Sequence, residues 1–162
     1  LFSRFHSLWP CLTNIKWGIW YILITDKKNK INKIIMKYIK KLLIPIFHTA
    51  NLILIILYLY PGSIFGHLLY GDSSLQPQIT RDFIISSNHL YVFIVLSALG
   101  IIAYQDTRKI KIITIYLFLL SIVLELAHIV IPVRAFEWTD LFGNIVGVIF
   151  VIIIYKIKSK YV

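Results

Sequence analysis

Side chains that can bind an anion or transfer a proton interrupt the apolar segments of this chain. Glu125 and His128 lie three residues apart and therefore share one face of a helix. His89 stands near the start of an earlier apolar segment, and Asn144 lies inside a later one. Carboxylate, imidazole and amide groups are suited to hydrogen-bonding an anionic ligand or to acid–base chemistry on a phosphate ester.

The segments that carry these groups are too apolar for a water-soluble domain. Of the 162 residues, 59% are hydrophobic and only 15% are charged, whereas a soluble domain has roughly 45–50% apolar residues. A chain of this length cannot bury so many hydrophobic residues in one small core. The composition therefore excludes a soluble enzyme. Because Cys11 is the single cysteine, a disulfide framework and a cysteine-based metal site are also excluded.

Four apolar segments predict an all-α fold, a polytopic membrane bundle of four transmembrane helices. Each segment ends at charged residues or at Pro and Gly, and they cover residues 42–60, 83–104, 112–131 and 141–155. As a helix the first would be about 28 Å long, which is just enough to cross roughly 30 Å of hydrocarbon.

Lysine and arginine predict the orientation, because they are enriched in cytoplasmic loops. They cluster before the first segment, between the second and the third, and after the fourth. The two remaining loops carry one such residue each, Arg81 and Arg134. Both termini are therefore predicted to be cytoplasmic. The net charge of +10 fits a membrane surface, and nucleic acid is not an expected partner.

The first 35 residues do not fit the pattern of spanning segments. Residues 17–24 are apolar but too short to cross a bilayer, and Met36, the only methionine, is followed by lysines and the first predicted helix. We expect translation to begin at Met36, so that residues 1–35 are an upstream extension and residues 36–162 form the membrane domain. The alternative is an interfacial amphipathic segment.

Helix rise places the polar residues of three segments at one depth. Glu125 lies about 20 Å from the cytoplasmic end of its helix. His89 lies about 22 Å from the cytoplasmic end of its helix at Tyr104, and Asn144 lies about 17 Å from that of its helix at Tyr155. Placing ionisable groups at such depth costs free energy, so these groups usually face the interior of the bundle and often belong to a functional site. The sequence therefore predicts a polar layer in the outer leaflet.

The loop before the fourth segment adds to this layer. Arg134 follows Pro132, and Asp140 precedes the fourth segment as an N-cap or first-turn acid, four residues before Asn144. Gly143 and Gly147 form a Gly-xxx-Gly pair that allows a neighbouring helix to approach closely. We expect this packing to press Asn144 toward the third helix.

Each of these residues also has a purely structural interpretation. Glu125 and His128 can form a satisfied pair inside the bundle that sets helix register. Asp140 can act as a cap alone, and Arg134 can extend to the membrane interface without holding a ligand. Gly143 and Gly147 can serve packing only.

The segment from Glu125 to Gly147 resembles the VanZ-like family. That family has a Glu, a Gln three positions later, a Pro and an Arg at the outer helix end, then an Asp, an Asn four later and a Gly three after that. The matching positions are Glu125, Pro132, Arg134, Asp140, Asn144 and Gly147. His128 departs from the pattern, since it stands where Gln is usual. An upstream motif is similar at His89, Tyr91 and Phe93, but Ser86, Ser87 and Asn88 replace its acidic and basic pair.

The resemblance implies a small integral protein of the bacterial cytoplasmic membrane with four or five helices. The family is named after a protein associated with resistance to the glycopeptide teicoplanin. It marks four residues as functional, Glu125, Arg134, Asp140 and Asn144, and it implies no particular chemical activity.

Our main hypothesis is a binding module for an anionic lipid or a lipid-linked envelope precursor at the outer leaflet. Arg134 would hold the phosphate or carboxylate. The predicted binding set is Glu125, His128, Arg134, Asp140, Asn144 and His89. No catalytic residue, metal or other cofactor is expected. The alternatives are a structural or assembly subunit, as a homo-oligomer or in a larger membrane complex, and an intramembrane phosphate-ester hydrolase or transferase.

Overall fold

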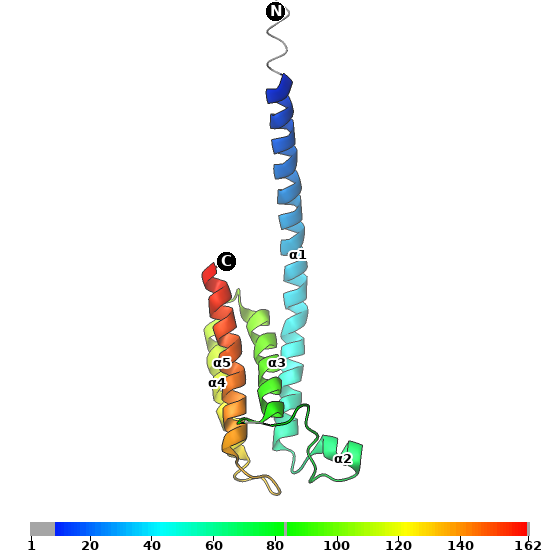
Figure 1. Ribbon diagram of the computed structural model, residues 1–162, viewed down its shortest axis with the longest axis vertical. Helices are drawn as coiled ribbons and strands as arrows, with labels where there is room; N and C mark the ends of the chain where they lie inside the picture. The colour runs from blue at the N-terminus through cyan, green and yellow to red at the C-terminus, as the bar shows by residue number, and fades with distance from the viewer. Residues whose placement is uncertain (1–8, 83, 162) are drawn as a thin grey trace, which may run out of the picture. The chain divides into compact units, whose positions relative to one another are not determined.

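The computed structural model describes the backbone of residues 9–82 and 84–161, with side chains from Thr25 onward apart from residues 29 and 33. This part of the chain is helical and contains no strand. Its helices are α1 (Trp9–Leu59), α2 (Ile64–Tyr70), α3 (Ser87–Tyr104), α4 (Ile110–Ala127) and α5 (Trp138–Tyr161), as Figure 1 shows.

The predicted all-α membrane bundle is confirmed. Four helical segments are long and apolar enough to cross a bilayer, namely Thr25–Leu59, Ser87–Tyr104, Ile110–Ala127 and Trp138–Tyr161. Their order along the chain follows the four predicted segments. The short helix α2 lies in the connection between the first and second of them.

The chain divides into two compact units, Leu1–Ile39 and Lys40–Val162. The first unit contains the N-terminal part of α1. The expected start at Met36 and the two interpretations of residues 1–35 stay predictions, since residues 1–8 and the side chains of residues 17–24 lie outside the described part.

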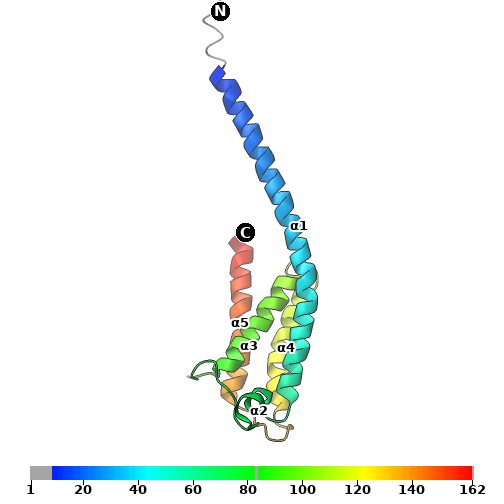
Figure 2. The ribbon, with the colours of Figure 1, turned by 90° about the vertical axis from the view of Figure 1, so that its right-hand side faces the viewer.

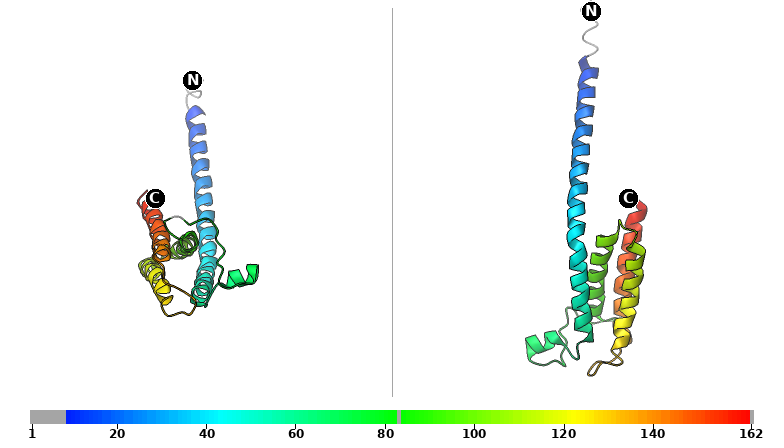
Figure 3. Two further views of the ribbon diagram at one scale, coloured as in Figure 1. Left: turned by 60° about the horizontal axis from the view of Figure 1, so that its bottom comes forward. Right: turned by 180° about the vertical axis from the view of Figure 1, so that it is seen from behind.

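The second unit is a bundle in which the C-terminal part of α1 and helices α3, α4 and α5 run side by side (Figures 1 and 3). Seen toward its end, the helices follow the order α1, α3, α5, α4 around the bundle (Figure 3). Helix α2 and the segments around it lie at the end of the bundle where α3 begins (Figure 2).

Small residues let α5 approach α3 closely. A Cβ atom added to Gly147 would lie 2.7 Å from the Leu90 carbonyl oxygen, and one added to Gly143 would lie 2.8 Å from that of Ser86. Both distances are shorter than a van der Waals contact, so the two positions require glycine. The predicted Gly-xxx-Gly packing is therefore present, and its partner is α3. Phe93, Leu117 and Val148 fill the adjoining core.

The helix ends differ from the predicted ones in several places. The largest difference is in α1, which extends from Trp9 although the predicted segment began at residue 42, and α5 begins at Trp138 and not at residue 141. Helix α4 ends at Ala127, before the predicted residue 131. The next three residues, 128–130, form tighter turns with backbone bonds to the residue three positions earlier, and Pro132 follows them. Helix α3 begins at Ser87, where Asp82 accepts a hydrogen bond from the backbone N–H, and not near residue 83. Helix α5 continues past residue 155 to Tyr161, because lysine is a good helix former and does not end a helix that leaves the membrane.

The lysine-rich end of the bundle is held by polar contacts of its own. Lys40 forms an ion pair with Asp106, and His48 bonds to the hydroxyl of Tyr104 at 2.8 Å. Asn51 donates to the hydroxyl of Tyr116 at 2.6 Å. His48 and Asn51 thus make helix contacts remote from the predicted polar layer.

Cysteine labelling checks the predicted orientation. In a Cys11→Ser background, Ser73→Cys in the connection between α1 and α3 should react with a membrane-impermeant maleimide added from outside intact cells. Ser159→Cys, near the end of α5, should react only after permeabilisation, because its neighbours Lys158 and Lys160 favour the cytoplasm. The opposite pattern would mean that the orientation is inverted.

Candidate functional site

Four helix ends meet at the end of the bundle opposite the lysines. Tyr58 lies at the C-terminal end of α1, His89 in the first turn of α3 and Glu125 in the last turn of α4. Asp140 and Asn144 lie in the first two turns of α5. The predicted polar layer is therefore assembled by the fold, and Asp140 is a first-turn acid as expected.

His89 is at the centre of this cluster and is surrounded by oxygen atoms. Its Nε2 lies 3.2 Å from Oδ2 of Asp140. Its Nδ1 lies 3.0 Å from the hydroxyl of Tyr58, 3.2 Å from Oδ1 of Asn144 and 3.8 Å from Oε2 of Glu125. Each of the four bundle helices thus contributes one or more groups to the site.

The amide of Asn144 is oriented by its neighbours. Its Nδ2 donates to the backbone carbonyl of Ser121 at 3.3 Å, so Oδ1 is the atom that faces His89. Oδ1 accepts a hydrogen bond from the Tyr58 hydroxyl at 2.8 Å. Asn144 therefore faces α4, as predicted from the glycine pair, and presents an acceptor to the centre of the site.

Glu125 and His128 form a buried pair. Oε1 of Glu125 lies 3.3 Å from Nδ1 of His128 and accepts a hydrogen bond from the backbone N–H of Glu137 at 3.1 Å. The other ring nitrogen of His128 lies 3.2 Å from the carbonyl oxygen of Tyr58, and the two rings stack. The pair is thus connected to both α1 and the loop before α5.

Arg134 hydrogen-bonds to carbonyl groups at the C-terminal end of α1. Its Nη2 donates to the carbonyl oxygens of Gly62 at 2.6 Å and Leu57 at 3.3 Å, and its Nε donates to that of Tyr60 at 3.3 Å. Leu57 lies in the last turn of α1, and Tyr60 and Gly62 follow its end, where the negative end of the helix dipole also favours a cation. Burial lowers the pKa of the Arg134 guanidinium from its usual value, while nearby acidic groups raise it. The group stays protonated at neutral pH.

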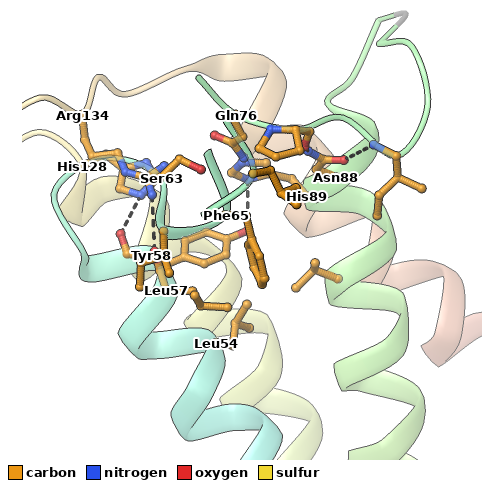
Figure 4. A pocket seen from close by; sticks show the side chains of 15 residues that line it. Leu54, Leu57, Tyr58, Ser63, Phe65, Gln76, Asn88, His89, His128 and Arg134 are labelled. Atoms are coloured by element: carbon orange, nitrogen blue, oxygen red, sulfur yellow. Dashed lines mark hydrogen bonds between the residues drawn. The ribbon is translucent and has the colours of Figure 1, made fainter. Parts of the chain in front are cut away.

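A pocket of about 330 Å³ adjoins the cluster (Figure 4). Polar side chains line its upper part as drawn in Figure 4, and leucines lie below them. The polar lining residues are Tyr58, Ser63, Gln76, Asn88, His89, His128 and Arg134. The apolar ones are Leu54, Leu57, Ile64, Phe65, Leu69, Pro77, Ile79 and Val92.

Asn88 holds one wall of this pocket in place. Its Oδ1 accepts from the backbone N–H of Ile79 at 2.9 Å, and its Nδ2 donates to the carbonyl of Pro77 at 2.7 Å. Ser87 fixes the same segment through the carbonyl oxygen of Thr80 at 2.6 Å. The segment that follows α2 is thereby tied to the first turn of α3.

A second, almost wholly apolar groove of about 380 Å³ adjoins the pocket and lies along α1 and α3. The two cavities share Leu54, Leu57, Ile79 and Val92. From there the groove extends toward the middle of the bundle. Its further lining residues are Ala50, Ile53, Tyr91, Val95, Leu96 and Leu99.

All six predicted binding residues lie at this end of the bundle, but in two groups. His89, Glu125, His128, Asp140 and Asn144 form the connected cluster, whereas Arg134 bonds to α1 and lines the pocket. Tyr58, which lies between the two groups, was not among the predicted residues. The only signal at that position is a tyrosine near a helix end, and tyrosine is common there in any membrane protein.

The chain matches no protein-family model, no curated protein and no solved structure. The resemblance to the VanZ-like family accordingly stays a prediction that rests on the residues from Glu125 to Gly147. What the protein does must be inferred from the site itself.

Proposed function

We propose that the protein binds an anionic lipid, with a phosphate-bearing headgroup in the pocket and a hydrocarbon chain in the groove between α1 and α3. The observation that carries this proposal is that the two cavities adjoin and share the lining residues Leu54, Leu57, Ile79 and Val92. A polar end joined to an apolar channel matches the two parts of a lipid.

The polar end has the chemistry to bind an anion. Its ionisable lining residues are Arg134, His89, His128 and Tyr58, and no carboxylate side chain of the described residues lines it. None of the described residues accepts a hydrogen bond from Nη1 of Arg134. Its Nε and Nη2 donate to carbonyl oxygens at the end of α1. A phosphate oxygen can take the Nη1 donor in a charge-assisted bond. Asn88 and Gln76 supply neutral amides at the same end.

The apolar groove has the composition of a chain-binding site. Along α1 it extends from Leu57 to Ala50, about 10 Å by helix rise. Side chains of Ile53, Val95 and Leu99 line it, so a hydrocarbon chain there replaces contacts with bulk lipid by contacts with protein. A headgroup held at the polar end therefore has room for its chain.

The distribution of lysines supports a location of this headgroup in the outer leaflet. A lipid-linked envelope precursor presents a phosphate at that membrane face and is one member of the proposed ligand class. The resemblance to the VanZ-like family supports the same proposal, since that family takes its name from a protein linked to resistance against an envelope-directed antibiotic.

Blocking the groove tests the proposal. Val92 lines both cavities, so Val92→Trp should fill their junction and lower retention of an anionic lipid by at least about tenfold, or about 1.4 kcal/mol. Retention is measured by native mass spectrometry from phosphatidylcholine nanodiscs that contain either phosphatidylglycerol or a polyprenyl phosphate. The two arms separate a diacyl lipid from an isoprenoid ligand.

The matched control is Val123→Trp, which adds the same side chain to an exposed position of α4. This variant should retain lipid like the wild type. Equal retention by Val92→Trp and Val123→Trp, or no preference of the wild type for either anionic lipid over phosphatidylcholine, would contradict the proposal.

A further inference from the structure

We propose that His89, Glu125 and Asp140 form a binding site for a divalent metal cation, of the Zn²⁺ or Mn²⁺ type. One ligand atom from each residue lies within 4.8 Å of the others. An imidazole nitrogen combined with carboxylate oxygens is a ligand set that both ions accept. The inference concerns the cluster behind the pocket and does not depend on the proposed lipid.

Hydrogen-bond acceptors are in excess around His89. Carboxylate oxygens of Asp140 and Glu125 and the amide oxygen of Asn144 approach the ring, and these atoms can only accept when the acids are ionised. The Tyr58 hydroxyl brings one proton, which it gives to Asn144. A buried group of this composition is stabilised by a cation or by added protons, and a divalent cation between the acceptors would satisfy several of them at once.

Independently of His89, Glu125 has a buried oxygen atom without a partner. Its side chain is 0% exposed, and its Oε2 has no hydrogen-bond partner among the described residues. Buried carboxylate oxygens are rarely left in that state. Oε2 is on the side of His89, at 3.8 Å from Nδ1, so a metal ion between the two residues would satisfy it.

Contacts outside the site already hold the Glu125 ligand in place. The backbone N–H of Glu137 and the ring of His128 fix Oε1 of Glu125, which leaves Oε2 directed toward the cluster. Outer contacts of this kind orient the ligands of metal sites. The three ligands come from α3, α4 and α5, and the closest of these helix contacts depends on Gly143 and Gly147.

Metal uptake by the purified protein is the test. After removal of bound metal with a chelator, the full chain is incubated with Zn²⁺, with Mn²⁺ or with Mg²⁺, dialysed, and analysed by inductively coupled plasma mass spectrometry. We expect about one equivalent of Zn²⁺ or Mn²⁺ per chain. Co²⁺ added to the stripped protein should give visible absorption bands of a nitrogen and oxygen site. No lipid is added, so failure here is separate from failure of lipid binding.

Two variants locate the site. Glu125→Gln and Asp140→Asn should each weaken metal affinity by at least about tenfold, which is the loss that even an outer partner of a metal ligand can cause. Glu137→Gln is the matched control, because it removes an exposed carboxylate and keeps the backbone N–H bond to Glu125. Thermal unfolding shows whether a variant is folded. If Glu125→Gln does not fold, Asp140→Asn still tests the site, because the Asp140 side chain is only partly buried.

Two results would overturn the proposal. One is a folded wild type that takes up neither Zn²⁺ nor Mn²⁺ and gives no Co²⁺ bands, in which case the cation among the acceptors is a proton on His89. The other is equal metal uptake by the wild type, Asp140→Asn and Glu137→Gln, which would place the metal elsewhere on the chain.

Discussion

Replacing Arg134 with Ala should reduce retention of an anionic lipid at least about tenfold and lower the thermal midpoint of the protein, because a charged hydrogen bond is worth roughly 1.5–3 kcal/mol. In the proposed mode of binding the same side chain has both roles. It donates to three carbonyl oxygens at the end of α1 and lines the pocket. Native mass spectrometry measures the first effect and thermal unfolding in detergent the second.

The matched control is Arg81→Ala, which removes the same charge from an exposed position in the connection between α2 and α3. It should leave both measurements near the wild-type values. Arg134→Lys separates the roles, since lysine keeps the positive charge but lacks the planar fork that bonds several carbonyls. Its lipid retention should exceed that of Arg134→Ala. Undiminished lipid retention by Arg134→Ala would argue that the residue only stabilises the end of α1.

Gly147→Leu should give the largest loss of stability, about 3 kcal/mol or more, because overpacking of a close contact typically costs 1–3 kcal/mol and here the added atoms meet backbone. Even the Cβ would lie 2.7 Å from the Leu90 carbonyl oxygen and 3.0 Å from the Cβ of Phe93. Helices α3 and α5 must then separate. Unfolding with a denaturing detergent, followed by circular dichroism, measures the loss.

Val146→Leu provides the comparison on the same helix. Val146 is 42% exposed, so the larger side chain can extend into lipid. We expect its unfolding midpoint to stay near that of the wild type. If Gly147→Leu were equally harmless, the approach of α5 to α3 would be looser than the structure has it.

The spanning helices could be predicted from sequence because their signal is simple. Long apolar runs that end at lysine, at Pro or at Gly have few other interpretations, and the order of the helices followed directly. The exact ends were harder to predict. Helix α3 begins where Asp82 accepts from Ser87, and this bond depends on how the preceding loop folds.

Which faces of the helices point inward was predictable only where polar or small residues mark them. In lipid the outer surface is as apolar as the core, so the apolar residues of a helix do not by themselves mark its inward face. His89, Glu125, Asp140 and Asn144 were informative because burying them has a clear physical cost. The structure groups these four at one end of the bundle, as their predicted depths required.

Contacts that depend on the path of the chain could not be predicted. The bonds of Arg134 to carbonyl groups of α1 join residues more than seventy positions apart. Tyr58 was missed for the same reason, because its position beside His89 and Asn144 follows from the way α1 packs on α3 and α5. The hydrogen-bond partner of a tyrosine hydroxyl near a helix end can be identified only in the folded protein.

The attachment of α1 differs from that of the other three helices. Close backbone approaches join α3, α4 and α5 to one another, whereas α1 reaches them through long side chains such as Phe47 and Tyr58. The boundary between α1 and α3 is therefore formed by side chains, and the apolar groove lies along it. We expect a lipid of the proposed class to enter sideways between these two helices, so that its polar group need not pass through water to reach Arg134.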